Sequence, residues 1–218
     1  MGKVETVLKA VSAPIYQLRI ELAGTEPPIW RRLLVRGDMN LGLLHAVIQV
    51  AMGWTNSHLH DFTIGNARYT DPQMDDDMGP NAAPARDEGK TTLIEAVPQE
   101  KAEFVYEYDY GDSWEHLITV EKTHGTDAMS KGSAKCLDGS RACPPEDCGG
   151  VGGYADLLEV IKNPKHEEHE SMMEWLGGKF DPEAFDITKT NKYLRKLKWP
   201  RTTEEQLADV LMERDGVS

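Results

Sequence analysis

Histidines and carboxylates occur in two short runs of this chain that could hold a metal ion. His58 and His60 stand two positions apart, so a strand that begins this early would place both imidazoles on one face. Asp112 and His116 lie in a second run, residues 108–116. Imidazole nitrogens and carboxylate oxygens are ligands of zinc, manganese and related divalent ions. His58, His60, Asp112 and His116 therefore form a candidate metal site, provided that the two distant segments meet.

The second run is also rich in aromatic side chains, and a ligand pocket at its tip is another interpretation. Small-molecule pockets combine apolar or aromatic walls with a few polar groups. The candidate pocket residues are Tyr108, Tyr110, Asp112, Trp114, His116, His58, His60, Glu146 and Asp147. The simpler interpretation is an aromatic core that contains a hydrogen-bonded histidine.

Three cysteines form a further possible ligand set for zinc. Cys136, Cys143 and Cys148 are separated by six and four residues and lack the Cys-x-x-Cys pair of structural zinc sites. We therefore expect three reduced thiols in a loop rich in proline and glycine. An odd number of cysteines also favours a reducing compartment.

A basic segment, residues 189–201, could contact phosphate groups. It holds six basic residues and no acidic residue: Lys189, Lys192, Arg195, Lys196, Lys198 and Arg201. The whole chain, however, carries a net charge of −13, and such a field repels nucleic acid. We expect these cations mainly to complement the dipole of their own helix.

Alternating apolar and polar residues predict the strands that must position these side chains. The first two strands and the pair around Gly65-Asn66 are expected to be antiparallel. A third pair surrounds residues 111–113. The expected strands cover residues 16–22, 29–36, 59–64, 67–70, 102–110 and 114–122.

Two registers are possible for the pair around residues 111–113. A two-residue turn pairs Glu107 with His116, whereas a three-residue loop pairs Tyr108 with His116. The three-residue loop gathers the aromatic side chains on one face, and burial of one large side chain contributes about 1.5–3 kcal/mol. We therefore expect the three-residue loop, because burial sets the register.

The first expected helix covers residues 41–52, with Asn40 as its N-cap. This segment is apolar on most sides, so the helix should be buried. Residues 92–97 predict a helical turn. The last part of the chain predicts helices at 154–162, 166–176, 187–197 and 204–214. Residues 123–153 are expected to be irregular.

The segment 71–90 has no aromatic residue, leucine, isoleucine or valine, which predicts a mobile acidic loop. Strands come first and helices last, which predicts an α+β fold. In this fold an antiparallel-rich sheet packs against a buried helix, with a helical C-terminal section. We expect one domain, residues 1–218, with its core at 14–198. The absence of an apolar leader or of a run of about 20 apolar residues predicts a cytoplasmic protein without membrane spans.

Several specific runs resemble the plasmid pRiA4b ORF-3-like family, also labelled insertion-element passenger proteins. The most specific are Tyr-Asp-Tyr-Gly-Asp-Ser-Trp-Glu-His at 108–116 and Cys-Pro-Pro-Glu-Asp at 143–147. Ile-Trp-Arg-Arg at 29–32, residues 45–54 and 58–62, and Phe-Asp-Pro at 180–182 add to the match. The resemblance covers about residues 14–198 and implies an α+β domain with a link to mobile elements, but no particular activity.

These observations favour a non-enzymatic binding or accessory module. A metal-dependent hydrolase that uses His58, His60, Asp112 and His116 with a divalent cofactor is the first alternative. Nucleic-acid contact through residues 189–201 is the second. No protein partner is indicated.

Overall fold

The computed structural model describes residues 13–73, 84–129 and 131–216. Within these ranges, its centre is an eight-stranded sheet of order β5-β4-β3-β6-β7-β1-β2-β8. Neighbouring strands are antiparallel except β4 and β5, which are parallel. The strands are β1 (Ile15–Leu22), β2 (Trp30–Arg36), β3 (His60–Ile64), β4 (Ala67–Thr70), β5 (Arg86–Asp87), β6 (Glu103–Tyr108), β7 (Trp114–His124) and β8 (Ala134–Ser140).

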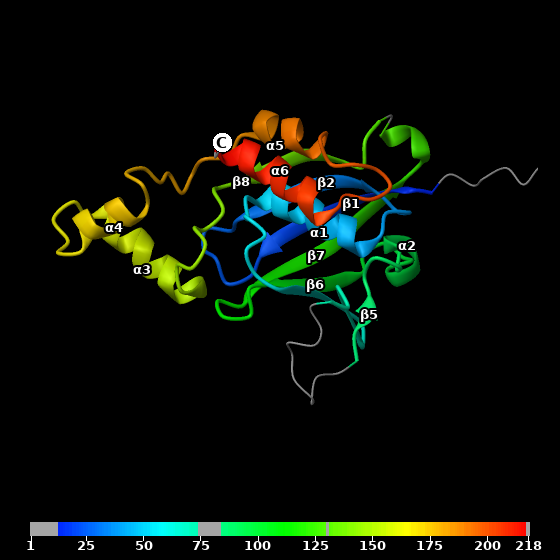
Figure 1. Cartoon of the computed structure of the whole chain (residues 1–218), viewed down its shortest axis with the longest axis horizontal. Helices are drawn as coiled ribbons and strands as arrows, with labels where there is room; N and C mark the ends of the chain where they lie inside the picture. The colour runs from blue at the N-terminus through cyan, green and yellow to red at the C-terminus, as the bar shows by residue number, and fades with distance from the viewer. Residues whose placement is uncertain (1–12, 74–83, 130, 217–218) are drawn as a thin grey trace, which may run out of the picture.

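Helices cover one face of this sheet. Figure 1 shows α1, α5 and α6 over the sheet, whereas α3 and α4 extend from one end of the molecule. The helices are α1 (Leu41–Met52), α2 (Leu93–Ala96), α3 (Gly150–Lys162), α4 (His169–Trp175), α5 (Ile187–Leu194) and α6 (Glu204–Asp215), with a 3₁₀ turn at Thr126–Ala128. No helix in the described ranges combines the length and the apolar character needed to span a bilayer.

Helix α1 is buried on nearly all sides because the sheet lies below it and α5 and α6 lie above it (Figure 1). Eleven of its twelve residues are buried, as its all-round apolar sequence predicts. Asn40 caps its first turn by accepting a hydrogen bond from the Leu43 N–H at 2.8 Å. At its other end, Arg214 of α6 donates to the carbonyls of Gln49 and Gly53, both at 3.1 Å. These contacts fix α1 and the loop that follows it.

The opposite face of the sheet is polar. Along β1, Tyr16, Leu18 and Ile20 are buried, whereas the intervening residues are partly exposed. On the polar face, Arg32 donates to both carboxylate oxygens of Glu121, at 2.7 and 2.8 Å. The alternation of apolar and polar residues therefore corresponds to one sheet face in the core and one in solvent, as is usual for antiparallel sheets. The α+β prediction and the predicted strand pairs are confirmed.

The predicted register of the β6–β7 hairpin is wrong by two residues. The observed pairs are Tyr106 with His116 and Tyr108 with Trp114, which leaves a five-residue loop. A shift by two keeps the same side chains on the buried face, so the predicted face is correct except for Tyr110, which lies in the loop. The ladder ends early because Asp109 adopts a positive φ of 60°.

Two segments are more regular than their composition predicts. In the segment 71–90, β5 pairs with β4 and Glu88 is buried, while residues 74–83 lie outside the described part of the chain. Backbone hydrogen bonds hold this segment, such as the one from the Glu88 N–H to the Thr70 C=O at 3.1 Å. A count of hydrophobic residues cannot predict such bonds. In the segment 123–153, β7 continues to His124 and β8 pairs with β2.

Candidate functional site

Three loops meet at the end of the sheet where β3 and β7 begin and β6 ends. The first, residues 53–59, leads from α1 into β3 and carries His58. The second is the tip of the β6–β7 hairpin and carries Asp109. The third leads from β8 into α3 and carries Glu146 and Asp147. Because β3 and β6 are neighbours in the sheet, the first two loops lie side by side.

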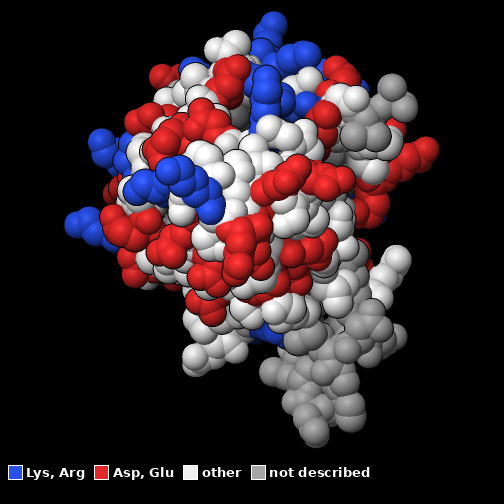
Figure 2. Space-filling view, turned by 90° about the vertical axis from the view of Figure 1, so that its left-hand side faces the viewer, with Lys and Arg blue, Asp and Glu red and all other residues white. Residues whose placement is uncertain are grey.

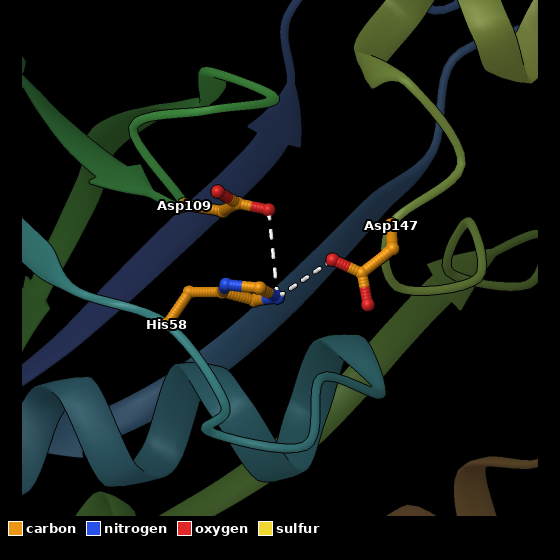
Figure 3. Close-up of side chains that lie close together, drawn as sticks. All are labelled: His58, Asp109 and Asp147. Carbon is orange, nitrogen blue, oxygen red and sulfur yellow. Dashed lines mark ion pairs between the residues drawn. The ribbon is translucent and has the colours of Figure 1, made fainter.

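His58 is the centre of this cluster. Its Nε2 lies 3.3 Å from Asp147 Oδ1, 3.6 Å from Asp109 Oδ2 and 3.8 Å from Glu146 Oε2. Figure 3 shows the two aspartates pointing at the imidazole from opposite loops. The side chains of Asp109 and Glu146 are mostly buried, whereas that of Asp147 is 74% exposed and marks the solvent side of the cluster.

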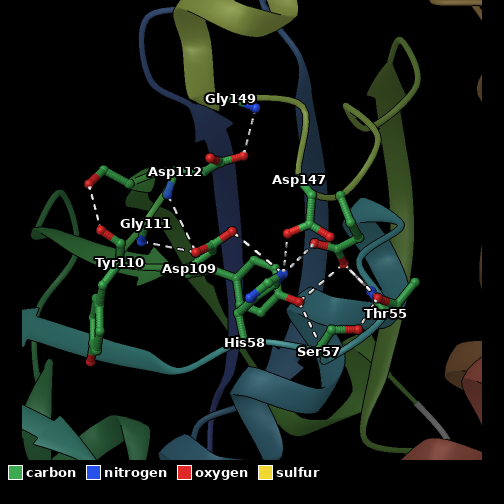
Figure 4. Close-up of polar contacts among 12 residues, drawn as sticks. Thr55, Ser57, His58, Asp109, Tyr110, Gly111, Asp112, Asp147 and Gly149 are labelled. Atoms are coloured by element: carbon green, nitrogen blue, oxygen red, sulfur yellow. Dashed lines mark hydrogen bonds and ion pairs between the residues drawn. The ribbon is translucent and has the colours of Figure 1, made fainter. Parts of the chain in front are cut away.

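Two carboxylates are oriented by hydrogen bonds through one oxygen only (Figure 4). Glu146 Oε1 accepts from the N–H and the hydroxyl of Thr55, at 2.7 and 2.8 Å, and from the Tyr108 hydroxyl at 3.1 Å. Asp109 Oδ1 accepts from the Gly111 N–H at 3.0 Å. Their other oxygens point at His58. Glu146 Oε2 and His58 Nε2 are buried atoms without a hydrogen-bond partner in the described structure.

The backbone around the cluster is strained. Asn56, Asp109, Ser113 and Asp147 have positive φ angles of 59°, 60°, 51° and 55°. Asparagine and aspartate tolerate this region better than other residues with a side chain, yet such conformations persist only where the surroundings enforce them. All four residues lie in the three loops of the site. The packing of these loops therefore offsets the backbone strain and fixes the positions of the side chains.

The glycine run at residues 149–153 brings the third loop against the hairpin tip. A Cβ at Gly153 would lie 1.9 Å from the Cys148 carbonyl oxygen, and one at Gly150 would lie 2.5 Å from that of Asp112. Asp112 Oδ2 accepts a hydrogen bond from the Gly149 N–H at 3.0 Å. These glycines are needed for close packing that places Glu146 and Asp147.

The spacing of the ligand atoms in the cluster is compatible with a bound cation. Hydrogen bonds between nitrogen and oxygen have a usual length of about 2.9 Å. Ligand atoms around an ion at about 2.0–2.1 Å in a tetrahedron lie about 3.3 Å apart. Among the described residues, His58, Asp109 and Asp147 are the one set of three such side chains with ligand atoms within 4.8 Å of one another. Glu146 stands just outside this set.

Only His58 of the four predicted metal ligands belongs to this cluster. His60 is buried in β3, where its Nε2 lies 3.0 Å from Glu88 Oε2 and its ring stacks on His45 with centroids 3.5 Å apart. The condition for His58 and His60 to share a strand face is not met, because β3 begins at His60 and His58 lies in the preceding loop.

His116 is a core residue whose two nitrogens are both used. Its Nε2 accepts from the Trp54 indole N–H at 2.9 Å, and its Nδ1 lies 3.2 Å from the Tyr106 carbonyl oxygen. Burial lowers the pKa of His116 to about 4, so the ring is neutral at pH 7. Trp114 and Tyr108 are fully buried as well. Tyr108, Trp114 and His116 are therefore core residues. Tyr108 also reaches the site, because its hydroxyl donates to Glu146 and its ring packs edge-on against that of His58, with centroids 5.8 Å apart.

Two other pocket candidates lie beside the cluster rather than in it. The Tyr110 hydroxyl donates to Asp61 Oδ2 at 3.2 Å, and burial raises the pKa of Tyr110. Asp112 supports the Gly149 backbone, as described above. Neither residue contributes to the group around His58.

The three cysteines are free thiols and do not form a ligand set with a histidine or carboxylate among the described residues. Cys136 lies in β8, where its backbone N–H and C=O pair with the Asn191 side-chain amide, both at 2.9 Å. Burial raises the pKa of Cys136 to about 11 and that of Cys148 to about 12, which keeps both protonated at neutral pH.

The basic segment 189–201 is partly engaged within the protein. Lys192 lies over the Tyr193 ring at 4.8 Å from its centroid, and Lys196 pairs with Glu213. Its contact with nucleic acid stays a prediction.

Asp109 is the functional candidate that the sequence reasoning missed. The alternation of the strand assigns it to the polar face of β6, but its positive φ takes it out of the strand. The spacing Asp109-x-Gly111 could have indicated this, because aspartate side chains commonly accept the N–H two residues later in a turn.

Comparison with known proteins now defines the family. Residues 14–189 match the family described as plasmid pRiA4b ORF-3-like protein. The chain belongs to this family. It is 37% identical over 193 residues to the uncharacterized protein y4hQ of Sinorhizobium fredii, a match that covers 87% of this chain and 96% of that protein.

A solved structure also resembles this fold. The crystal structure of the protein of unknown function MM3350 from Methanosarcina mazei Go1 has a TM-score of 0.71 and 34% sequence identity, and the match covers 81% of this chain and 96% of that one. Neither relative carries a stated activity in its name.

Proposed function

We propose that this chain is a divalent-metal-binding module and that His58, Asp109 and Asp147 hold the ion. The observation that carries the proposal is the convergence of one imidazole nitrogen and two carboxylate oxygens from three loops, at separations of 3.3 and 3.6 Å from the nitrogen. Imidazole with carboxylates suits zinc, manganese or iron(II). Asp109 Oδ1, the oxygen that faces away from His58, accepts a hydrogen bond from the Gly111 N–H. Side chains that bind a metal are usually held in place by hydrogen bonds of this kind.

An internal ion pair between His58 and the surrounding carboxylates is the competing explanation. The two explanations predict opposite results in a binding experiment. We expect isothermal titration calorimetry to detect one site for Zn²⁺ or Mn²⁺ per chain after treatment with a chelator. Protein that binds neither ion under these conditions would support the ion pair instead.

Variants test which residues hold the ion. We expect Asp109→Asn and His58→Gln each to weaken metal binding by more than about 100-fold. Loss of a residue that only supports a ligand weakens binding by about 100-fold at most, so a larger loss indicates a direct ligand. Thr55→Val removes one hydrogen bond to Glu146, which is not one of the three proposed ligands, and should weaken binding much less than the ligand variants do. His124→Ala is the matched control, because His124 lies at the far end of β7 and bonds to Gln17. Equal affinity in Asp109→Asn and wild type would refute the proposal.

Metal-dependent hydrolysis is a second candidate, and Glu146 is the observation that favours it. Three protein ligands leave positions open for water, as in catalytic zinc sites. Glu146 Oε2 is buried, has no hydrogen-bond partner among the described residues and lies 3.8 Å from His58 Nε2. Such a carboxylate could take a proton from a metal-bound water. We expect Glu146→Gln to retain the ion and to abolish hydrolysis of ester or amide substrates. If metal-loaded wild-type protein hydrolyses none of them, the function is binding alone.

A further inference from the structure

A cavity adjoins the proposed metal site. It has a volume of about 300 Å³ and lies between α3, α4 and the loop that carries Asp147. Leu157 of α3 and Met172 and Trp175 of α4 supply its apolar wall. Asp147 lines the cavity and also directs one carboxylate oxygen at His58. The cavity and the cluster are therefore neighbours that share one side chain.

The apolar wall of this cavity is accessible to a ligand. Trp175 is 51% exposed, which is unusual for the largest aromatic side chain, and Met172 is half-buried. Tryptophan offers the best aromatic face for a cation, and methionine adapts its shape to different ligands. Such a wall fits an apolar body of modest size.

The charge around the cavity selects among ligands. Residues 146–186 contain eleven acidic residues and three lysines, a net charge of −8. Figure 2 views this end of the molecule, and acidic side chains spread across the middle of the face. Even with a divalent ion bound, the three carboxylates around His58 leave a net charge of −1. This field attracts cations and repels carboxylate or phosphate ligands.

We propose that this cavity binds an organic cation with an apolar body. The apolar part packs against Leu157, Met172 and Trp175, and the positive charge lies toward Asp147 and the Trp175 ring. The inference goes beyond the metal site. The two sites share Asp147, but the apolar wall of the cavity comes from α3 and α4, so the cavity can be tested in metal-free protein.

Three matched probes test the proposal in protein freed of metal by a chelator. Phenethylammonium, phenethyl alcohol and hydrocinnamate share a phenyl body and differ in charge. We expect the affinities, measured by calorimetry or ligand-observed NMR, to fall in that order. Equal binding of the cation and the anion, or binding of none of the three, would overturn the proposal.

Variants locate the probe. Trp175→Ala should weaken phenethylammonium binding about tenfold, because it removes both the cation–π contact and apolar area. Asp147→Asn should weaken the cation but not the neutral alcohol, a difference that a purely structural role would not produce. Trp199→Ala is the control, since Trp199 is also exposed but stacks on Arg36, 4.5 Å from the guanidinium carbon to the ring centroid. Unchanged binding in Trp175→Ala would refute the location. Failure of metal binding leaves these results intact, so the two proposals fail separately.

Discussion

Replacement of Glu88 by glutamine should change how stability depends on pH. Glu88 is only 6% exposed, and its Oε2 lies 3.0 Å from His60 Nε2. Burial raises the pKa of Glu88 to about 7 from 4.5. Burial also lowers the pKa values of His45 and His60 to about 3 from 6.5. The three side chains therefore form a buried cluster in which the neutral form of each group is favoured.

The sign of each contribution follows from the proton balance. Between pH 4.5 and about 7, folded Glu88 holds a proton that the unfolded chain releases, so stability falls as pH rises. The full effect is roughly 3 kcal/mol, because each pKa unit corresponds to about 1.36 kcal/mol. The two histidines act oppositely: between pH 3 and 6.5 the unfolded chain binds more protons, so stability rises with pH. Above pH 6.5, Glu88 sets the direction among these three groups.

Urea denaturation at pH 5 and pH 8 measures the difference. Glu88→Gln has no carboxyl to ionise and its amide can still donate to His60, so we expect the variant to gain about 2–3 kcal/mol relative to wild type on going from pH 5 to pH 8. Glu159→Gln is the control, because Glu159 is exposed on α3. If the difference between Glu88→Gln and wild type were the same at both pH values, the assignment of a raised pKa to Glu88 would be refuted.

Three further predictions concern the framework of the site. Arg31→Met should lower the free energy of unfolding, measured by urea titration, by at least about 3 kcal/mol. The reason is that the buried guanidinium donates to five backbone carbonyls, which would lose their partner. A loss below about 1 kcal/mol, as for typical surface changes, would contradict this prediction. Gly153→Ala should weaken metal binding, because its Cβ would displace the Cys148 carbonyl and with it the loop of Asp147; Gly152→Ala, which meets no neighbouring atom within 4 Å, should bind normally. Asn191→Ala should cost about 1–3 kcal/mol by leaving the edge of β8 unpaired at Cys136, measured by thermal unfolding; an unchanged transition would show that water replaces the amide.

Local sequence pattern was sufficient for the main elements of the fold. The alternation in residues 16–22 and the all-round apolar sequence of residues 41–52 predict β1 and α1, because strand and helix periods differ and burial follows them. The same patterns indicate which side chains of the aromatic hairpin are buried, although its register is off by two residues. Strand period is two, so pattern alone cannot distinguish registers that differ by an even number.

The sequence also indicated most of the candidate site, since His58, Glu146 and Asp147 stand out as polar residues among aromatic and proline-rich runs. Pattern could not choose between His58 and His60, which have the same residue type and neighbouring positions. The choice depends on where β3 begins: His60 enters the core beside Glu88, and His58 remains in the loop.

Tertiary structure alone decided which loops meet. Asp109 joins the site because its backbone adopts a left-handed conformation at the end of β6, and Asp147 joins it because the glycines of α3 allow close approach to the hairpin tip. Both effects depend on contacts between segments some 40–90 residues apart. The order β3-β6-β7 in the sheet brings the loops of His58 and Asp109 together, and the contact between Gly149 and Asp112 brings in the loop of Asp147. Local periodicity does not encode that order, so the chemistry of His58 becomes visible only in the folded protein.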